Sequence, residues 1–242
     1  MNKNKYKNVL LKLSGEALMG KTAFGISNEV LGYLSDEIKK LKDLGVQMSL
    51  VVGAGNIFRG VAGVSQGMDR VSADYMGMLS TVINSLAIEN ALERAGVPAR
   101  VLSAISMPAV CETYARQRAV RHLNRGRVVI FAAGTANPYF TTDTAAVLRS
   151  LEINAELICK ATRVDGVYDK DPLANDDAVK FDTLSYGEVL YRRLRVMDST
   201  AISLAMENDL PIVVFDINVP DNMRKAVCGE KVGTLITGEK NG

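Results

Sequence analysis

The sequence predicts an α/β protein with three layers, an αβα sandwich in which helices cover both faces of a mainly parallel central sheet. Two observations predict this fold class and its organisation as a single domain. Short runs rich in β-branched residues and leucine alternate with longer segments of helical period along the whole chain. Such alternation is typical of parallel strands joined by helices.

Six short runs are predicted to be strands, at residues 9–13, 48–52, 100–102, 128–132, 156–160 and 212–216. Residues 28–44 carry apolar side chains at helical spacing between the first two runs. Residues 71–95 repeat that spacing and end before Gly96, a residue typical of helix C-termini. Shorter helices are expected at 145–151 and 200–208.

The second observation is the absence of internal repeats, low-complexity tracts and Pro/Ser-rich linkers in the 242 residues. We therefore expect a single domain over residues 1–242. A soft division near 151–154 would separate a first lobe, 1–150, from a second, 155–242.

Composition excludes several kinds of protein. Hydrophobic residues make up 48% and charged residues 23% of the chain, as in ordinary soluble proteins. The net charge of +2 does not favour nucleic acid as a partner, and no run is long and apolar enough to be a membrane span. The single histidine, His122, argues against a histidine metal site or a Ser/His/Asp triad. Three scattered cysteines (Cys111, Cys159 and Cys228) indicate a reducing compartment, so we expect a cytoplasmic protein.

Four segments at predicted strand ends carry candidate chemistry. In the first, Lys12 is followed by Leu13, Ser14 and Gly15, which together offer an ammonium group and free backbone N–H groups to an anion. Alone, this segment is better explained as an edge-strand lysine followed by an ordinary turn.

The second segment, at 53–60, holds small residues at Gly53, Ala54 and Gly55 with Arg59 close behind. Small residues let backbone N–H groups approach phosphate, and an arginine adds a permanent charge. The segment is not a P-loop, because no Gly-Lys-Ser/Thr follows. It is not a dinucleotide fingerprint either, because Phe58 occupies the third glycine position. The alternative is a tight strand-to-helix turn.

The third segment, 133–144, is a long loop that leads into a helix. Thr141, Thr142 and Asp143 lie at the helix start, where their oxygen atoms can cap free N–H groups. The same position suits an anionic ligand. Asp143 fits beside phosphate only if it pairs with a lysine, and Lys12 is the candidate.

The fourth segment, 160–172, contains the turn signals Asp165-Gly166 and Asp171-Pro172. It could be a β-hairpin. It could also form the edge of a nucleotide site, with Tyr168 packing on a base and Asp171 accepting from ribose hydroxyls.

These segments closely resemble the bacterial UMP kinases of the amino-acid-kinase superfamily. The resemblance rests on Lys-Leu-Ser-Gly-Glu at 12–16, Gly-Ala-Gly-Asn-Ile-Phe-Arg-Gly at 53–60, Asp-Tyr-Met-Gly-Met at 74–78, the 134–144 loop, and Lys-Ala-Thr-Arg-Val-Asp-Gly-Val-Tyr at 160–168. It implies an amino-acid-kinase-like fold and transfer of the ATP γ-phosphoryl group to UMP. It also places the acceptor in the lobe 1–150 and ATP in the lobe 155–242.

The resemblance implies roles for individual residues. ATP would contact Lys12, Leu13, Ser14, Gly15, Gly55, Arg59, Thr162, Tyr168 and Asp171. UMP would contact Gly53, Ala54, Asp74, Thr135, Ala136, Asn137, Pro138, Tyr139, Phe140, Thr141 and Thr142. Catalysis would fall to Lys12 and Arg59 at the transferring phosphoryl, to Asp143 orienting Lys12, and more weakly to Lys160.

Two departures from the family pattern bear on UMP affinity. Ala54 and Ala136 stand where relatives usually have glycine. An alanine is acceptable only where its backbone avoids positive φ or bears a modest cost there. Weaker UMP binding is expected if either position needs positive φ.

The resemblance further implies Mg²⁺ carried by the ATP phosphates and a homohexamer built through the helix at 71–95. GTP would activate and UTP would inhibit, with the GTP response assigned to Gly20, Lys21, Thr22, Ala23, Phe24 and Gly25. Two alternatives stay open. One is a superfamily kinase acting on an amino-acid carboxylate, and the other is a non-enzymatic UMP- or UTP-binding regulator.

Other features have structural explanations. The arginines around His122 are expected to form a solvated helix face, with His122 at the surface. Asp74 could instead be a helix-surface carboxylate paired with Arg70, four residues earlier. Asp198 is expected to cap the helix at 200–208.

Overall fold

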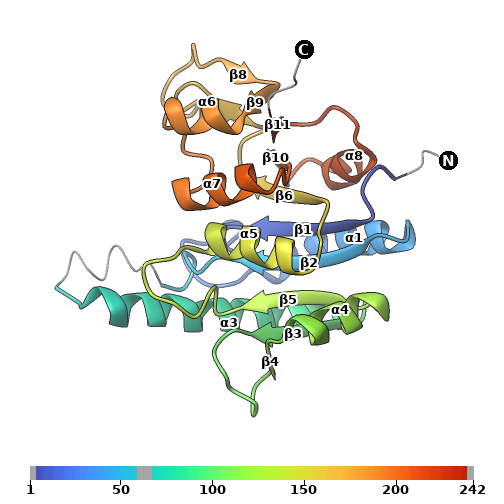
Figure 1. The fold of residues 1–242 in the computed structure, drawn as a ribbon. Helices are drawn as coiled ribbons and strands as arrows, with labels where there is room; N and C mark the ends of the chain where they lie inside the picture. Colours follow the sequence, from blue (N-terminus) through green and yellow to red (C-terminus); the bar gives the residue numbers. More distant parts are fainter. Residues whose placement is uncertain (1–3, 59–66, 239–242) are drawn as a thin grey trace.

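A nine-stranded sheet forms the centre of the computed structural model, which describes residues 4–58 and 67–238. The strand order is β4-β3-β5-β2-β1-β6-β10-β11-β9 (Figure 1). The strands are β1 (Asn8–Leu13), β2 (Gln47–Val52), β3 (Ala99–Ser103), β4 (Glu112–Thr113), β5 (Val128–Ala132), β6 (Leu157–Thr162), β9 (Thr183–Ser185), β10 (Ile212–Asp216) and β11 (Thr234–Thr237). All neighbours pair in parallel except β10 and β11. β11 runs opposite to β10, and β9 is parallel to β11. The carboxyl ends of the other seven strands therefore meet at one edge, the side to which the arrowheads of β1, β5 and β6 point in Figure 1.

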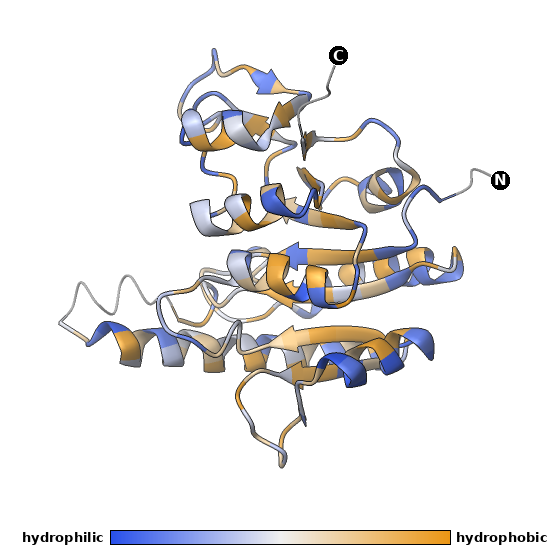
Figure 2. Cartoon of the chain, viewed as in Figure 1, coloured by the Kyte–Doolittle hydropathy of each residue, from blue (hydrophilic) through white to orange (hydrophobic). Residues whose placement is uncertain are grey.

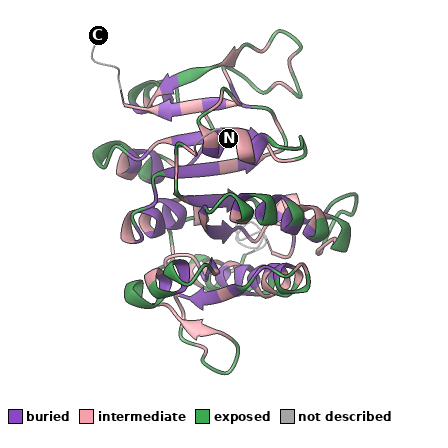
Figure 3. Ribbon diagram, turned by 90° about the vertical axis from the view of Figure 1, so that its right-hand side faces the viewer, coloured by how far each residue is buried: buried purple, intermediate pink, exposed green. Residues whose placement is uncertain are grey.

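Helices cover both faces of this sheet, which confirms the three-layer prediction. One core contains buried side chains of α1 (Asn28–Asp43), α3 (Arg70–Arg94) and α8 (Asn222–Cys228). The opposite face is covered by α4 (Arg116–Asn124), α5 (Thr142–Glu152), α6 (Tyr186–Tyr191) and α7 (Ser199–Glu207). A short 3₁₀ helix, η1 (Gly15–Leu18), follows β1. The central strands are mostly apolar and buried, and the helices are exposed on their outer sides (Figures 2 and 3).

Alternation along β1 decides which way its lysine points. Val9, Leu11 and Leu13 belong to the core beneath α1, α3 and α8. Leu10 belongs to the opposite core, beneath α4 and α5. Successive side chains of a strand point to opposite faces, so Lys12 shares the α5 side with Leu10.

The six predicted strands and the predicted helices are present, with ends that shift by a few residues. The largest shift is in α5, which begins at Thr142 because the Thr141 hydroxyl accepts from the N–H groups of Asp143 and Thr144. Asp198 caps α7 as predicted, accepting from the Ala201 N–H at 2.9 Å.

Two expectations are wrong. Residues 160–172 do not form a hairpin by themselves, because β7 (Val167–Tyr168) pairs with β8 (Lys180–Phe181) across a longer loop. His122 is not at the surface: it is only 6% exposed, with Nε2 at 3.2 Å from Glu112 and Nδ1 at 3.0 Å from Arg127. It shares the sheet-facing side of α4 with Ala119 and Leu123, while Arg116, Arg118, Arg121 and Arg125 are exposed as expected.

Within the part of the chain that the structure describes, no helix combines the length and the apolar character needed to cross a bilayer.

Candidate active site

Two lysines stand side by side on neighbouring central strands. Lys12 of β1 is in register with Lys160 of β6, and each shares the α5 side of the sheet with the residue two positions before it, Leu10 or Ile158. Their side chains are 5% and 15% exposed. Because β1 lies between β2 and β6, the edge-strand explanation of Lys12 is wrong.

A single carboxylate, Asp143, binds both ammonium groups from the first turn of α5. Lys12 Nζ lies 2.8 Å from Asp143 Oδ1, and Lys160 Nζ lies 3.0 Å from Oδ2. The cap made by Thr141 fixes the helix start and with it the position of this carboxylate.

The charges of the cluster are unequal, since two cations share one anion. Burial alone would raise the pKa of Asp143, but the ammonium groups of Lys12 and Lys160 outweigh it and lower that pKa to about 2. Burial also lowers the pKa of Lys160, and the attraction of Asp143 opposes this shift. The cluster keeps an ionised carboxylate and excess positive charge, which suits an anionic ligand.

Two glycine-containing turns pack directly against each other beside Lys12. The Gly53 N–H donates to Leu13 O at 2.9 Å. A Cβ added to Gly15 would lie 2.6 Å from Gly55 N and 2.8 Å from Gly53 O. Only glycine fits at position 15 without displacing the other turn. Arg59, predicted to contribute to the same site, lies outside the described residues.

The loop before α5 has an unusual backbone. Ala133, Gly134, Ala136 and Tyr139 adopt positive φ values of 60°, 56°, 63° and 71°. Ala54, which also replaces a glycine of the family pattern, is not among the positive-φ residues. Of the two alanine departures, only Ala136 therefore occupies a conformation that favours glycine.

A cavity of about 270 Å³, here called the acceptor-side cavity, lies between α3 and this loop. Its lining includes six of the residues predicted for UMP: Ala54, Asp74, Thr135, Phe140, Thr141 and Thr142. The other five (Gly53, Ala136, Asn137, Pro138 and Tyr139) do not line it.

Asp74 is paired with Arg70 as the surface explanation anticipated, but it also reaches the loop. Arg70 Nε lies 2.8 Å from Asp74 Oδ2, and the Tyr139 N–H donates to the same oxygen at 2.7 Å. The sequence-based prediction missed Arg70, Ala73, Gly77, Met78 and Thr81 in this wall. They follow from Asp74 by helical spacing, which was the available signal.

A second cavity, about 570 Å³ and here called the donor-side cavity, lies beyond Lys160. Three of the residues assigned to ATP from the sequence, Thr162, Tyr168 and Asp171, line it together with Lys160. The lining also includes Arg192, Arg193 and Arg195, which the prediction missed although they form a dense basic run in the sequence.

The lysine cluster thus lies between the two cavities. Lys160 lines the donor-side cavity, and Thr142, next to Asp143 in the chain, lines the acceptor-side cavity. Lys12 lines neither cavity and is joined to Lys160 through Asp143.

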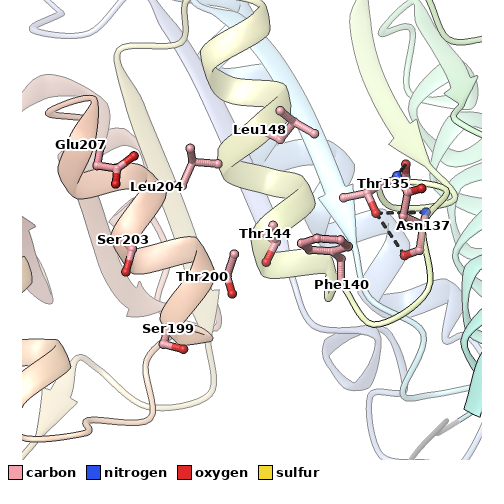
Figure 4. A pocket seen from close by; sticks show the side chains of 10 residues that line it. All are labelled: Thr135, Asn137, Phe140, Thr144, Leu148, Ser199, Thr200, Ser203, Leu204 and Glu207. Atoms are coloured by element: carbon pink, nitrogen blue, oxygen red, sulfur yellow. Dashed lines mark hydrogen bonds between the residues drawn. The ribbon is translucent and has the colours of Figure 1, made fainter.

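A third hollow of about 560 Å³ runs between α5 and α7 (Figure 4). Phe140 and Thr135 border both it and the acceptor-side cavity. It is larger than the acceptor-side cavity, yet none of its lining residues is cationic. Asp198, before α7, accepts from Thr144 Oγ1 at 3.1 Å and from Thr141 Oγ1, both at the start of α5. We therefore do not place phosphate chemistry there.

The segment predicted to respond to GTP, 20–25, lies against the glycine-rich turn. The Gly25 N–H donates to Asn56 O, and Asn56 Nδ2 donates to Gly25 O, both at 2.9 Å. Phe24, in the same segment, is exposed.

Three solved structures that resemble this chain are kinases of the same nucleotide. The crystal structure of UMP kinase from Bacillus anthracis matches with a TM-score of 0.93 and 42% identity, covering 97% of each chain. UMP kinase from Ureaplasma parvum matches with a TM-score of 0.89 and 34% identity, covering 96% of this chain and 99% of the other. Uridylate kinase from Archaeoglobus fulgidus matches with a TM-score of 0.74 and 29% identity, over 95% and 99%. The model of the amino acid kinase family matches residues 7–216, and the chain belongs to that family.

Proposed function

We propose that this enzyme transfers the γ-phosphoryl group of ATP to UMP, giving ADP and UDP. The observation that carries the proposal is the buried Lys12–Asp143–Lys160 cluster between two cavities at the carboxyl edge of the sheet. The crystal structures of UMP kinases that this chain resembles support the choice of acceptor.

The reaction needs positioning and charge more than a base. The phosphate of UMP is already a nucleophile, so the barrier is the approach of two anions. Lys12 and Lys160 would neutralise the transferring phosphoryl group, and Asp143 would hold both ammonium groups in place. Arg59 is proposed to add a third cation.

ATP is proposed to occupy the donor-side cavity and to extend over Leu13, Ser14, Gly15 and Gly55. Its base would pack near Tyr168 and its ribose near Asp171, both of which line that cavity. Within residues 4–58 and 67–238, no group of three or more His, Cys, Asp or Glu residues could hold a metal. Mg²⁺ would enter with ATP, held by the phosphate oxygens, and help to neutralise their charge.

UMP is proposed to occupy the acceptor-side cavity, in the lobe 1–150, while the base and ribose of ATP lie in the lobe 155–242. Thr141 and Thr142 offer hydroxyl and backbone donors at the start of α5 to its phosphate, and Asp74 offers a carboxylate to its ribose. The cavity's modest size favours a pyrimidine nucleotide, and the product UDP would feed pyrimidine nucleotide synthesis in the cytoplasm.

A homohexamer with contacts through α3 is part of the proposal. Tyr75, Met76, Leu79 and Ile83 are exposed apolar residues on this helix, and three of them are spaced by four. An exposed apolar stripe of this kind is typical of an interaction surface. Gel filtration that gives one monomer-sized species would contradict the hexamer.

GTP activation through residues 20–25 and UTP inhibition complete the proposal. The hydrogen bonds between Gly25 and Asn56 would let this segment act on the glycine-rich turn. Added GTP should raise and UTP should lower the rate at subsaturating UMP.

A coupled assay of ADP release tests the proposed function. MgATP is offered with UMP, CMP or N-acetylglutamate in parallel reactions. We expect release with UMP and much slower release with the others. Release with N-acetylglutamate instead would indicate an amino-acid carboxylate kinase, and no release with any acceptor would contradict a kinase function.

A further inference from the structure

Two asparagines form a buried pair beneath the glycine-rich turn. Asn56 follows that turn and is 1% exposed, and Asn84 of α3 is 0% exposed. Asn84 Nδ2 lies 2.7 Å from Asn56 Oδ1, and Asn56 Nδ2 lies 2.9 Å from Asn84 Oδ1. A buried amide pair is stable only if its remaining groups also find partners.

The remaining N–H groups of the two side-chain amides donate to backbone carbonyl oxygens. Asn84 Nδ2 also donates to Gly53 O at 2.8 Å, and Asn56 Nδ2 to Gly25 O at 2.9 Å. Each side-chain amide has two N–H groups, so all four are used. The pair is also close to the Ser14-Gly15 turn, since a Cβ on Gly15 would lie 2.5 Å from Asn56 Oδ1.

The bond from Asn84 fixes the orientation of one peptide unit. In a trans peptide the C=O of Gly53 and the N–H of Ala54 point in opposite directions. With the carbonyl held toward α3 by Asn84, the Ala54 N–H points the other way. Ala54 lines the acceptor-side cavity, and within the described parts of the chain its N–H donates to no protein acceptor.

We propose that Asn84 is a positioning residue for the acceptor: by holding Gly53 O, it turns the Ala54 N–H toward the acceptor phosphate. The inference rests on the proposed function. Asn84 would not touch the substrate, and its effect would pass through the Gly53–Ala54 peptide. Without this donor, Gly53 O would be a buried acceptor lacking its partner. Rotation of the Gly53–Ala54 peptide toward another donor or toward water would then be favourable.

Asn84→Ala tests the proposal, with Ser85→Ala as the matched control. Ser85 is equally buried on the next residue of α3, but its hydroxyl donates only to Thr81 O within the helix. Both variants lose a buried polar contact, and only Asn84→Ala frees the turn. UMP affinity is measured by calorimetry without ATP, and KM for UMP and for ATP in the coupled assay.

We expect Asn84→Ala to weaken UMP binding about tenfold and to raise KM for UMP in parallel, the scale of one lost buried hydrogen bond. KM for ATP should change less, and Ser85→Ala should bind UMP like the wild type. Wild-type UMP affinity in Asn84→Ala would overturn the proposal, as would an equal loss in Ser85→Ala.

Two further measurements cover a variant that does not fold. Asn84→Ser keeps a buried hydroxyl but is too short to hold Gly53 O, so it should also lose UMP affinity. In the wild-type protein labelled with ¹⁵N-alanine, UMP should shift the Ala54 amide resonance, identified by its loss in Ala54→Gly. An unshifted Ala54 resonance at saturating UMP would contradict the proposal, whereas a wild type that neither binds nor phosphorylates UMP would contradict the proposed function instead.

Discussion

The two cavities on either side of the lysine cluster are lined by different kinds of secondary structure. The wall of the acceptor-side cavity is the 25-residue helix α3 and a loop latched to it through Asp74 and the Tyr139 N–H. The donor-side cavity has about twice the volume, 570 against 270 Å³. Its walls combine the ends of the central strands β6 and β10 with turns and the two-residue strand β7. Tyr168 and Asp171 there bond to nearby turn residues, Asp165 and Leu173.

This difference predicts a division of labour. A wall fixed by a long helix can hold donors and acceptors in one arrangement, and so can reject a wrong acceptor. Walls made from short turns adapt more readily. We expect strict selection of the acceptor nucleotide and more tolerance toward the base of the donor.

Lys12→Ala would have the largest effect, because Lys12 is the more buried of the two lysines that share Asp143 between the cavities. Removing it takes one of two buried cations from the phosphoryl path, and we expect turnover to fall about 1,000-fold. UMP affinity, measured by calorimetry, should change far less. Lys39→Ala, at an exposed lysine that bonds Ala95 O, is the control. Near-normal turnover in Lys12→Ala would remove the cluster from the mechanism.

Asp143→Asn should lower turnover about 100-fold, because both ammonium groups lose the carboxylate that orients them. The same variant tests the pKa shift. The pKa of the Asp143 carboxyl falls from its ordinary value of 3.8 to about 2 in the folded protein. Above pH 4 the ionised carboxylate therefore stabilises the folded state by about 2 kcal/mol.

That stabilisation is lost as the pH falls from about 4 toward 2, where the folded protein finally takes up the proton. Urea unfolding of the wild type should therefore weaken across this window. Asp143→Asn should be less stable at neutral pH and should weaken less on acidification. Equal acid sensitivity of the two proteins would mean that Asp143 is not held in its ionised form by the lysines.

Asp74→Ala and Asp171→Ala test the two sides separately. Loss of Asp74 removes both a carboxylate and the latch on the loop, so KM for UMP should rise about tenfold with KM for ATP unchanged. Loss of the more exposed Asp171 should raise KM for ATP about threefold and leave KM for UMP unchanged. Steady-state kinetics with each substrate varied in turn give both values. If both variants changed the same KM, the assignment of the two cavities to different substrates would be wrong.

The smallest effects concern the two alanines that replace glycines. Ala136→Gly relieves a left-handed alanine at φ 63°, and this gain is partly offset by a more flexible unfolded chain. We expect a stability gain of about 0.5 kcal/mol and less than about a threefold change in KM for UMP. Ala54→Gly should instead lose about 0.5 kcal/mol, because Ala54 has no positive φ to relieve. Thermal unfolding of the pair measures both, and shifts of the same sign would contradict the backbone argument.

Sequence patterns predicted features that depend on neighbours along the chain. The strands, the Thr141 and Asp198 caps and the position of Asp143 in the first turn of α5 all follow from local rules. The pairing of Lys12 with Asp143 was also proposed, because a carboxylate beside phosphate needs a cation. That argument uses chemistry and needs no coordinates.

Features that depend on distant packing were missed. The strand β7 looked like half of a local hairpin, because the turn signal at Asp165-Gly166 says nothing about a partner at 180–181. His122 looked solvated among arginines, yet α4 presents it to the interior between Glu112 and Arg127. Asn84 carries no motif, and only the fold brings it under Gly53.

The in-register lysines on β1 and β6 have a consequence for the resting protein. Two like charges share one carboxylate in a dry setting, so the empty fold contains a local conflict that a polyanionic ligand resolves. Such sites trade stability for activity. A chain freed from selection for turnover would be expected to exchange Lys160 for an apolar residue and become harder to melt.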